Sequence, residues 1–416
     1  MSAVPGPSME GGSQGTTATR NGGASNGVAD TSQRSSHPNR NEKEEGNKGK
    51  AKKRTIRKWR LHPGNNVFCC DGLIMVSKQS GVFVLTILLL VATLATFFVF
   101  DAPYLFVQVS PALPIIEAIL ALVMFANLFK TTFSDPGILP RATSEEAADE
   151  QRRIVEKLAA MENGETPSFP PSNRANQLRS IQVTINGVAM RLKKCTTCQL
   201  YRPPRCSHCS ICNNCILAFD HHCPWVGNCV GLRNYRHFYF FLISLCILIL
   251  FTFGCSSAHL AMLTREKPFT DALKETPASI VVAAVCFFSF FSITCLSSFH
   301  TYLMATNLTT NEDIKGTFSK RRRPPTSNPY HLGSALKNCC SRLCGPDLPS
   351  LLDSRGMVRE VNAIELAAAL EAASASRSAA PSNHSRSHTS TMSSTTATGI
   401  SAYASTASDE RIIAPA

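Results

Sequence analysis

The sequence predicts an integral membrane protein of the all-α class, with four transmembrane helices, a cytosolic cysteine-rich domain and disordered termini. Three observations lead to this fold class. Four long stretches are apolar and almost free of charged residues. A separate stretch, residues 195–229, contains eight of the 17 cysteines and three of the 11 histidines. Both ends of the 416-residue chain lack apolar runs and are rich in small residues, which is typical of disordered segments.

Length and composition predict the four membrane helices. About 20 consecutive apolar residues in a helix cross a hydrocarbon layer of about 30 Å. The second run contains a single charged residue, Glu117, and an acid in such a run is functional, turned into the bundle or close to the interface. The turn residues Ser-Asp-Pro-Gly at 134–137 end this helix. The runs are residues 81–100, 112–129, 238–263 and 278–304, with a linker over 101–111 and a charged loop over 265–275.

The distribution of basic residues predicts the orientation. Lysine and arginine concentrate in residues 48–60, in the long central segment and at 320–323, whereas the two short loops between spans are not enriched in them. The positive-inside rule therefore places both termini and the cysteine-rich stretch in the cytosol, where thiols stay reduced. Residues 48–60 are either a solvated or nuclear-import charge run, or a juxtamembrane segment held to anionic lipid at about 1 kcal/mol per basic residue. The apolar run that follows favours the lipid.

The cysteine-rich stretch is an internal repeat. Shifted by 14 residues, its pattern C-x2-C-x9-H-x6-C falls on a second, interleaved copy of itself. Three cysteines and one histidine, two of the cysteines in a tight CxxC turn, are the ligands of a structural zinc site. The alternative is one site made from the four cysteines of the two CxxC pairs, which would leave the other four ligands without a metal. The repeat assigns Cys195, Cys198, His208 and Cys215 to one Zn2+, and Cys209, Cys212, His222 and Cys229 to a second.

Cys223 is left over by the repeat, because the position of its CxxC partner is occupied by Val226. An aspartate and two histidines precede it directly, and the second histidine is assigned to zinc. We therefore expect Cys223 to be a nucleophile, His221 the base that accepts its proton, and Asp220 the acid that orients His221. The alternative is a buried structural thiol, which is the commoner fate of a free cysteine. Cys206 is also left over, and no role is predicted for it.

A thiolate at a membrane surface fits one reaction in particular. It can attack an acyl thioester, hold the acyl chain as an enzyme thioester, and pass it to a second thiol with little change in free energy. Burial of each methylene group contributes about 0.8 kcal/mol, so a long acyl chain needs an apolar place near the nucleophile. The four apolar spans and the lack of a basic finger-type helix argue against nucleic acid as a partner.

The run C-x2-C-x9-H-C-x2-C-x2-C-x4-D-H-H-C-x5-C-x4-N-x3-F, at residues 195–238, closely resembles the cysteine-rich domain of DHHC-type protein S-acyltransferases, or palmitoyltransferases. Asp-Pro-Gly at 135–137 and Thr-Thr-Asn-Glu at 309–312 resemble that family's DPG and TTxE motifs. The resemblance implies two-step transfer of a long-chain acyl group from acyl-CoA, such as palmitoyl-CoA, through Cys223 to protein cysteines. It also implies two Zn2+ in the interleaved sites, and a contact of Thr310 with the region of Asp220.

Two further segments, NPYHLGSALKNCCSRLCGP at 328–346 and GNNVFCCDG at 64–72, resemble the subgroup that acylates Ras-like proteins at the Golgi. This implies substrates with membrane-proximal cysteines, a small Golgi-associated accessory subunit, and a Golgi or endoplasmic reticulum location. Spans of about 20 residues suit a plasma membrane equally well. The three cysteines that follow the fourth span, close to the membrane, are candidate S-acylation sites. Zinc binding is the weaker alternative for them, because no fourth ligand lies close by. They are Cys339, Cys340 and Cys344.

A different class of function is a membrane-anchored zinc module that binds partners or serves as a ubiquitin-ligase adaptor. The spare Asp-His-Cys set disfavours it, because a binding module has no need of an activated nucleophile. The predicted segments are a disordered N-terminus (1–46), a basic juxtamembrane segment (47–80), helices one and two (81–133), a cytosolic linker with an amphipathic helix over 145–161 (134–194), the cysteine-rich domain (195–237), helices three and four (238–304), the TTxE and CCxxxC region (305–360), and a low-complexity tail with a short helix over 362–373 (361–416).

Overall fold

The structure, a computed structural model, describes residues 55–162, 179–318 and 327–359, and all of them belong to one compact unit. The terminal segments predicted to be disordered, the helix predicted over 362–373 and the basic residues 320–323 lie outside the described residues. Within the described residues, four helices are long and apolar enough to cross a membrane. They confirm the predicted membrane fold with four helical spans. These helices span Gly81–Gln108, Ala112–Phe133, Tyr235–Glu266 and Pro277–Ala305.

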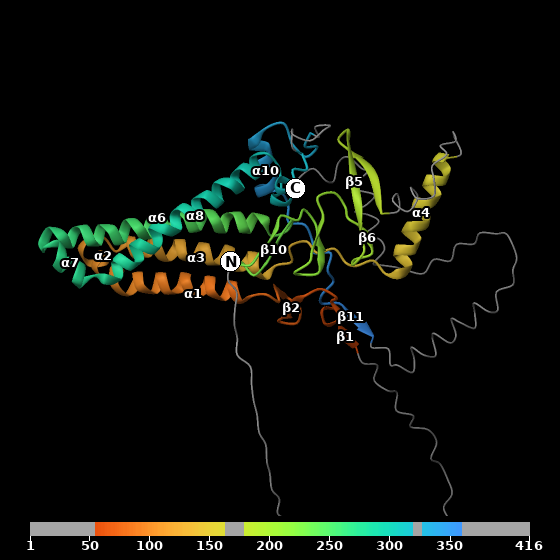
Figure 1. The fold of residues 1–416 in the computed structure, drawn as a ribbon. Coiled ribbons are helices and arrows are strands. Elements are labelled where there is room, and N and C mark those ends of the chain that lie inside the picture. Colours follow the sequence, from red (N-terminus) through yellow and green to blue (C-terminus); the bar gives the residue numbers. More distant parts are fainter. Residues whose placement is uncertain (1–54, 163–178, 319–326, 360–416) are drawn as a thin grey trace, which may run out of the picture. The chain divides into compact units, whose positions relative to one another are not determined.

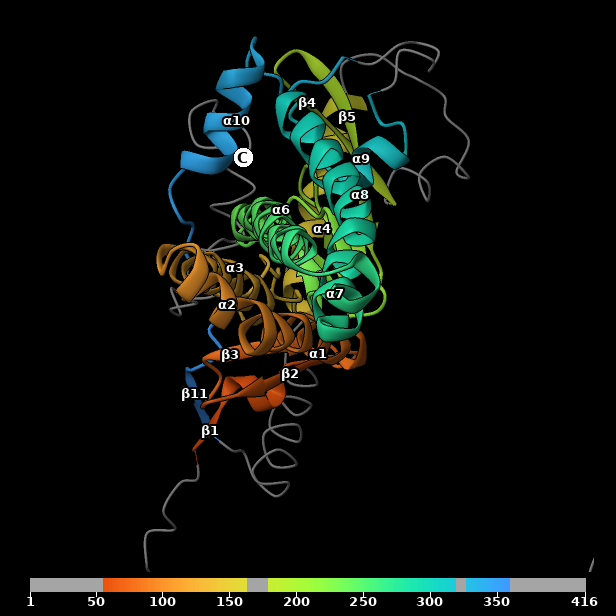
Figure 2. The ribbon, with the colours of Figure 1, turned by 90° about the vertical axis from the view of Figure 1, so that its left-hand side faces the viewer.

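The four spans pack together as a bundle in which α6 contacts both α3 and α8. Figure 1 shows α1, α3 and α6 running side by side and α8 crossing α6 at an angle, with α7 at one end and the strands of the cysteine-rich region at the other; Figure 2 looks along the bundle. The third span is the most buried, while the other three expose apolar side chains, as helices in lipid do. The helices are α1 (Gly81–Thr96), α2 (Ala102–Gln108), α3 (Ala112–Phe133), α6 (Tyr235–Glu266), α7 (Phe269–Glu275), which fills most of the predicted charged loop, and α8 (Pro277–Ala305).

The first membrane helix is longer than predicted. Most of the linker expected over residues 101–111 is helical, because a π-helical stretch, η2 (Phe97–Asp101), joins α1 to α2. The charge of Asp101 ended the apolar run in the sequence, but its carboxylate is buried and accepts hydrogen bonds from Ser256 at 2.9 Å and Ser279 at 2.6 Å. His259 Nδ1 lies 2.7 Å from the same carboxylate. Because these partners satisfy the charged group, the helix continues past it.

Glu117, the acid of the second span, is turned into the bundle. It lies in α3 and is fully buried. Its Oε1 accepts a hydrogen bond from the hydroxyl of Thr252 in α6, at 2.5 Å. Its Oε2 has no hydrogen-bond partner among the described residues. Of the three alternatives that the sequence left open, the contact with Thr252 supports the one in which the acid is turned into the bundle.

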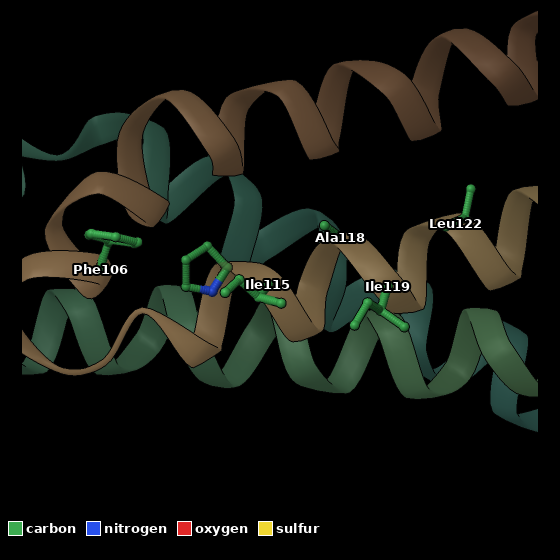
Figure 3. A pocket seen from close by; sticks show the side chains of 6 residues that line it. Phe106, Ile115, Ala118, Ile119 and Leu122 are labelled. Atoms are coloured by element: carbon green, nitrogen blue, oxygen red, sulfur yellow. The ribbon is translucent and has the colours of Figure 1, made fainter.

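The outer face of the bundle between α2 and α3 carries a shallow apolar groove (Figure 3). No charged or hydrogen-bonding side chain lines it. Such a surface belongs in hydrocarbon, because water would leave its apolar groups without favourable contacts. The lining residues are Phe106, Pro114, Ile115, Ala118, Ile119 and Leu122.

The cysteine-rich region is built from short antiparallel strands, which the spacing of its cysteines did not predict. β7 pairs with β8, β9 pairs with β10, and β4, β5 and β6 form a three-stranded sheet. An isolated two-stranded hairpin is marginally stable in water, and metal ligands within it can supply the missing stability. The strands are β4 (Ser180–Ile185), β5 (Val188–Cys195), β6 (Leu200–Tyr201), β7 (Ser207–Cys209), β8 (Asn214–Ile216), β9 (His221–Cys223) and β10 (Asn228–Val230).

The segment before the first membrane helix folds onto the cysteine-rich region. Strand β1 pairs with β11, so the described end of the basic block is joined to the chain beyond the fourth helix. Arg57 and Lys58 form exposed ion pairs with Asp71 and Asp353, each at 2.7 Å. The remaining elements are β1 (Thr55–Arg57), the 3-10 turn η1 (Lys58–Leu61), β2 (Asn66–Cys69), β3 (Ile74–Ser77), α4 (Ser144–Glu162) at the predicted amphipathic helix, α9 (Thr310–Ile314), α10 (Ala335–Cys344) and β11 (Met357–Arg359).

Two buried asparagines fasten the cysteine-rich region to the end of α3. The last carbonyl groups of a helix have no partner within the helix. Asn228 donates to the carbonyl oxygens of Thr132 and Ser134, at 2.8 and 2.9 Å. Asn234 donates to the carbonyl oxygen of Thr131 at 3.0 Å. The strands that follow the cysteines are thereby held at a fixed place on the bundle.

The Asp135-Pro136-Gly137 turn is tied to the same region. Asp135 Oδ1 accepts hydrogen bonds from the backbone N–H groups of Gly137 and Ile138, at 2.9 and 2.8 Å. Its Oδ2 lies 3.0 Å from Arg233, in an ion pair. Gly137 has a φ of 108°, which a side chain would strain. The segment that resembles the DPG motif therefore ends α3 and links it to the chain just before α6.

We predict that Gly231→Ala destabilises the protein. A Cβ at this position would lie 2.6 Å from the Ile216 side chain and 2.7 Å from the Pro136 carbonyl oxygen. Overpacking of this kind costs about 1–3 kcal/mol. Gly254→Ala in α6 is the matched control, because its Cβ would meet nothing within 4 Å. Thermal unfolding in detergent should give a lower midpoint for Gly231→Ala alone, and equal midpoints for the two variants would contradict the packing described here.

Candidate active site and metal clusters

The eight predicted metal ligands come together as two clusters. Their members are those that the interleaved repeat assigns, and within each cluster the ligand atoms lie within 4.8 Å of one another. The single site of four cysteines, which the sequence left as an alternative, would need side chains from both clusters. One cluster contains Cys195, Cys198, His208 and Cys215, and the other contains Cys209, Cys212, His222 and Cys229.

The first cluster has the dimensions of a tetrahedral zinc site. His208 Nδ1 lies 3.6 Å from the sulfur of Cys195, 3.5 Å from that of Cys198 and 3.7 Å from that of Cys215. A zinc ion with bonds of about 2.3 Å to sulfur and about 2.0 Å to nitrogen holds such atoms about 3.5 Å apart. Four protein ligands leave no open position, so a metal here would be structural. The donor set and its spacing are thus compatible with zinc.

The second cluster has the same dimensions and one further neighbour. His222 Nδ1 lies 3.5 Å from Cys212 Sγ and 3.4 Å from Cys229 Sγ. The hydroxyl oxygen of Ser77, at the end of β3, lies 3.8 Å from Cys212 Sγ and is buried. Sequence reasoning missed Ser77, because no spacing rule connects the segment before the first span with a cysteine 135 residues further along. A hydroxyl in this place can donate to a metal-bound thiolate.

Alternation along β9 separates the two adjacent histidines. Successive side chains of a strand point to opposite faces. His222 joins the second metal cluster, whereas His221 and Cys223 face the membrane helices. The turn after β9 needs Gly227, whose φ is 66° and where a Cβ would lie 2.9 Å from the Phe83 side chain of α1. The strand therefore offers one side chain to the metal and two to the end of the bundle.

The three side chains predicted as nucleophile, base and orienting acid lie at the same end of the bundle, and the base and the acid are in contact. Cys223 is buried in the same hydrophobic cluster as Phe83 and Phe238. His221 Nδ1 lies 2.7 Å from Asp220 Oδ2, and Cys223, two residues further along β9, lies on the same face of that strand as His221. Because Nδ1 is directed at the carboxylate, Nε2 is the nitrogen available to the thiol. The arrangement can pass a proton from sulfur to imidazole.

In the Asp220–His221 pair, charge and burial shift the pKa values in opposite directions. Burial alone would raise the pKa of the Asp220 carboxyl group, but the hydrogen bond and the charge of His221 lower that pKa to about 2. Burial alone would lower the pKa of His221, but hydrogen bonds to Asp220 and Cys223 and their charges raise that pKa to about 10. His221 is therefore a strong acceptor for the proton of a thiol, and its cation is stable beside a thiolate.

The chain after the fourth helix closes over the acid. Thr310 donates its N–H to Asp220 Oδ1 at 2.9 Å and its hydroxyl to Oδ2 at 2.6 Å. The contact implied by the family resemblance is therefore present. Thr309 and Glu312 form a capping box at the start of α9, which fixes the backbone around Thr310. Glu312 is in turn paired with Arg205 at 2.8 Å, and both side chains are buried.

Arg205 is a residue of the site that sequence reasoning missed. It also donates to the side-chain oxygen of Asn307 at 3.0 Å, and its guanidinium lies 4.5 Å from the ring centre of Tyr330. It therefore joins the cysteine-rich domain to two segments that follow the fourth helix. The one sequence signal for Arg205 was Glu312, the acid of the TTxE motif. A buried carboxylate needs a cationic partner, so a basic residue was to be expected near it.

Comparison with known proteins agrees with these contacts. The family model described as DHHC palmitoyltransferase matches residues 188–317. Palmitoyltransferase ZDHHC18 of Mus musculus is 50% identical over 313 residues, which cover 75% of this chain and 79% of that protein. The chain belongs to the DHHC palmitoyltransferase family. Palmitoyltransferase ZDHHC9 of Homo sapiens is 47% identical over 307 residues, or 74% of this chain and 81% of that protein.

The match to one further relative covers a smaller share of that relative. Palmitoyltransferase ZDHHC14 of Homo sapiens is 50% identical over 303 residues, which cover 73% of this chain but only 60% of ZDHHC14. The chain thus spans about three-fifths of the length of that relative.

The three cysteines of the CCxxxC segment and Cys206 lie in different surroundings in this DHHC chain. α10 carries Cys339, which is half-buried and packs against the core of the bundle, and Cys340 and Cys344, which are exposed. Cys206 is half-buried beside the first metal cluster, where it contacts Cys215. The contact gives Cys206 a neighbour but no chemical role.

We predict that Ser77→Ala weakens metal retention in the second cluster. Loss of a hydrogen-bond partner of a metal ligand commonly lowers metal affinity by about 10- to 100-fold. Ser80→Ala is the matched control, because the Ser80 side chain forms no capping hydrogen bond at the start of α1. Zinc released to a chelator should show one of two ions leaving at least about 10-fold faster from Ser77→Ala. Equal release from both variants would exclude a role of Ser77 at the metal.

Proposed function

We propose that this protein is an S-acyltransferase that moves a long-chain acyl group, such as palmitoyl, from acyl-CoA through a thioester on Cys223 to cysteines of cytosolic or membrane-associated proteins. The observation that supports it is the position of Cys223 on the same face of β9 as His221, which is paired with Asp220, at one end of a bundle of apolar helices. Membership of the DHHC family supports the same activity.

The first step loads the enzyme. His221 accepts the proton of Cys223 through Nε2, and Asp220 stabilises the imidazolium that forms. The thiolate attacks the carbonyl carbon of the acyl thioester, the bond from that carbon to the sulfur of CoA breaks, and His221 returns the proton to the departing thiolate. In the second step a protein thiol gives its proton to His221, attacks the enzyme thioester and releases Cys223. Each step exchanges one thioester for another, so no further reactant is needed.

The two metals have a supporting role in this proposal. Zn2+ in the closed clusters would contribute free energy of folding, on the order of 10 kcal/mol per ion, to strands that bury little apolar surface of their own. It would supply no chemistry to the acyl group, because all four positions are filled by protein ligands. In this proposal the cysteine and histidine ligands hold β9, and with it His221 and Cys223, against the bundle.

The location and partners belong to the same proposal. Basic segments at the cysteine-rich end support a cytosolic active site with membrane lipid around the helices. The subgroup resemblance supports a Golgi or endoplasmic reticulum membrane, Ras-like substrates and a small accessory subunit. On α10, the exposed Cys340 and Cys344 are the better candidates for S-acylation, and Cys339 the poorer one because the bundle partly covers it.

We predict that Cys223→Ser abolishes acyl transfer. Purified protein incubated with labelled palmitoyl-CoA should carry label on Cys223 and pass it to a client thiol, and the variant should do neither. The labelled position must be mapped by mass spectrometry, because the cysteines of α10 can also take up label. Cys295→Ser, at an exposed cysteine of α8, is the control with unchanged transfer. Full transfer by Cys223→Ser would refute the nucleophile, and a wild type that never loads would favour a binding module.

A second prediction concerns Thr310. Hydrogen bonds to charged groups contribute about 1.5–3 kcal/mol, so Thr310→Val should slow the loading of Cys223 by about 10-fold or more. Thr310→Ser keeps the hydroxyl and should remain close to wild type. Thr306→Val removes a hydroxyl that bonds only to backbone carbonyls of α8 and serves as the control. Loading that is equally slow in Thr310→Val and Thr310→Ser would show that the hydroxyl is not what matters.

A further inference from the structure

A second imidazole lies beside the Asp220–His221 pair. His300 is in α8, five residues before the helix ends at Ala305, and only 2% of its surface is exposed. Its ring centre lies 5.8 Å from that of His221. One polar atom each of Asp220, His221 and His300 lies within 4.8 Å of the other two. Neither the metal repeat nor the DHHC, DPG and TTxE motifs include this histidine, so the proposed reaction leaves it without a role.

Tyr235 is the hydrogen-bond partner of Nδ1 of His300. The Tyr235 hydroxyl oxygen lies 3.2 Å from His300 Nδ1, and both side chains are buried. A hydroxyl that donates to Nδ1 leaves the proton of a neutral imidazole on Nε2. The guanidinium of Arg342 lies 4.7 Å from the centre of the Tyr235 ring, so a cation already occupies the far side of this tyrosine. A second cation at His300 would be disfavoured by its charge.

Phe238 connects the two histidines. Its ring centre lies 5.3 Å from that of His221 and 5.0 Å from that of His300, with the planes at 68° and 79°. Such edge-to-face contacts favour one orientation of each ring. His221 is therefore held by a hydrogen bond to Asp220 and by contact with Phe238, and His300 adds the polar neighbour from α8.

We propose that His300, held by Tyr235, is a positioning residue for acyl transfer. As a neutral imidazole it offers a donor near a buried carboxylate without adding charge, and it fixes the orientation of the Asp220–His221 pair from the side of the membrane helices. An apolar side chain here would leave the buried Tyr235 hydroxyl without its partner, which is unfavourable. A lysine or arginine would compete with His221 for Asp220. The inference rests on the proposed function, because it assigns a further residue to that reaction.

The test compares His300→Phe, His300→Asn and Tyr235→Phe with wild type. The measurement is single-turnover loading of Cys223 from labelled palmitoyl-CoA, over a range of concentrations. Phenylalanine keeps the ring without its nitrogens, and asparagine keeps hydrogen-bonding groups near the position of Nδ1. We expect His300→Phe to lower the saturating loading rate at least tenfold with little change in the half-saturating concentration. His300→Asn should recover most of the rate, and Tyr235→Phe should lower it several-fold.

His259→Phe is the matched control. This histidine is equally buried in a membrane helix and has its own carboxylate partner, but it lies 24 residues from Tyr235 along α6, about 36 Å away. Its loading rate should stay within about twofold of wild type. Unaltered loading in His300→Phe would overturn the inference. So would equal losses in the Phe and Asn variants accompanied by lost zinc or a lower melting midpoint, because that result describes a purely structural residue.

Loading of the wild type distinguishes a failure of the role of His300 from a failure of the proposed function. If wild type loads Cys223 and His300→Phe loads it equally fast, only the role of His300 falls. If wild type does not load Cys223 at all, the proposed function fails and the role of His300 falls with it.

Discussion

The site depends on one buried carboxylate. Asp220 is 1% exposed, and an unpaired charge at such a position would cost several kcal/mol. Its two oxygens accept two hydrogen bonds from Thr310 and are paired with His221. These partners come from the cysteine-rich strands and from the chain beyond the fourth membrane helix. Because neither segment alone can satisfy the charge, the site forms only when the two have docked.

The buried pair of Arg205 and Glu312 sets the register of this docking. A buried ion pair adds little stability, since desolvation of both charges offsets most of their attraction. Displacement of one partner, however, leaves the other charge buried and unpaired. Glu312 also completes the capping box with Thr309, so a shift of α9 would break both interactions at once. The Arg205–Glu312 pair therefore selects the one position of α9 in which Thr310 contacts Asp220.

The sequence was sufficient where the determinants are local. Hydropathy over some 20 residues located the four spans, and the spacing of cysteines grouped the ligands as the structure groups them. The sequence was insufficient where a buried polar residue has its interaction partner far away in the chain. Asp101 looked like the end of a helix because its partner Ser279 is 178 residues away. Ser77, Arg205 and His300 are single residues without periodicity, so nothing near them in the chain indicates the cluster that each joins.

The residues proposed for metal binding and for catalysis are consecutive in the sequence, and the geometry of a strand separates their side chains. His222 turns to a metal cluster, while His221 and Cys223 turn to the helices, because side chains alternate along β9. A shift of the strand by one residue would exchange these faces, placing His221 or Cys223 in the metal cluster. The metal ligands exclude this shift, since the partner of His222 across the ribbon is Cys229. A metal in this cluster would therefore fix the register of the strand that carries Cys223, whereas Asp220 has its partner Thr310 in α9, outside the strands of the metal clusters.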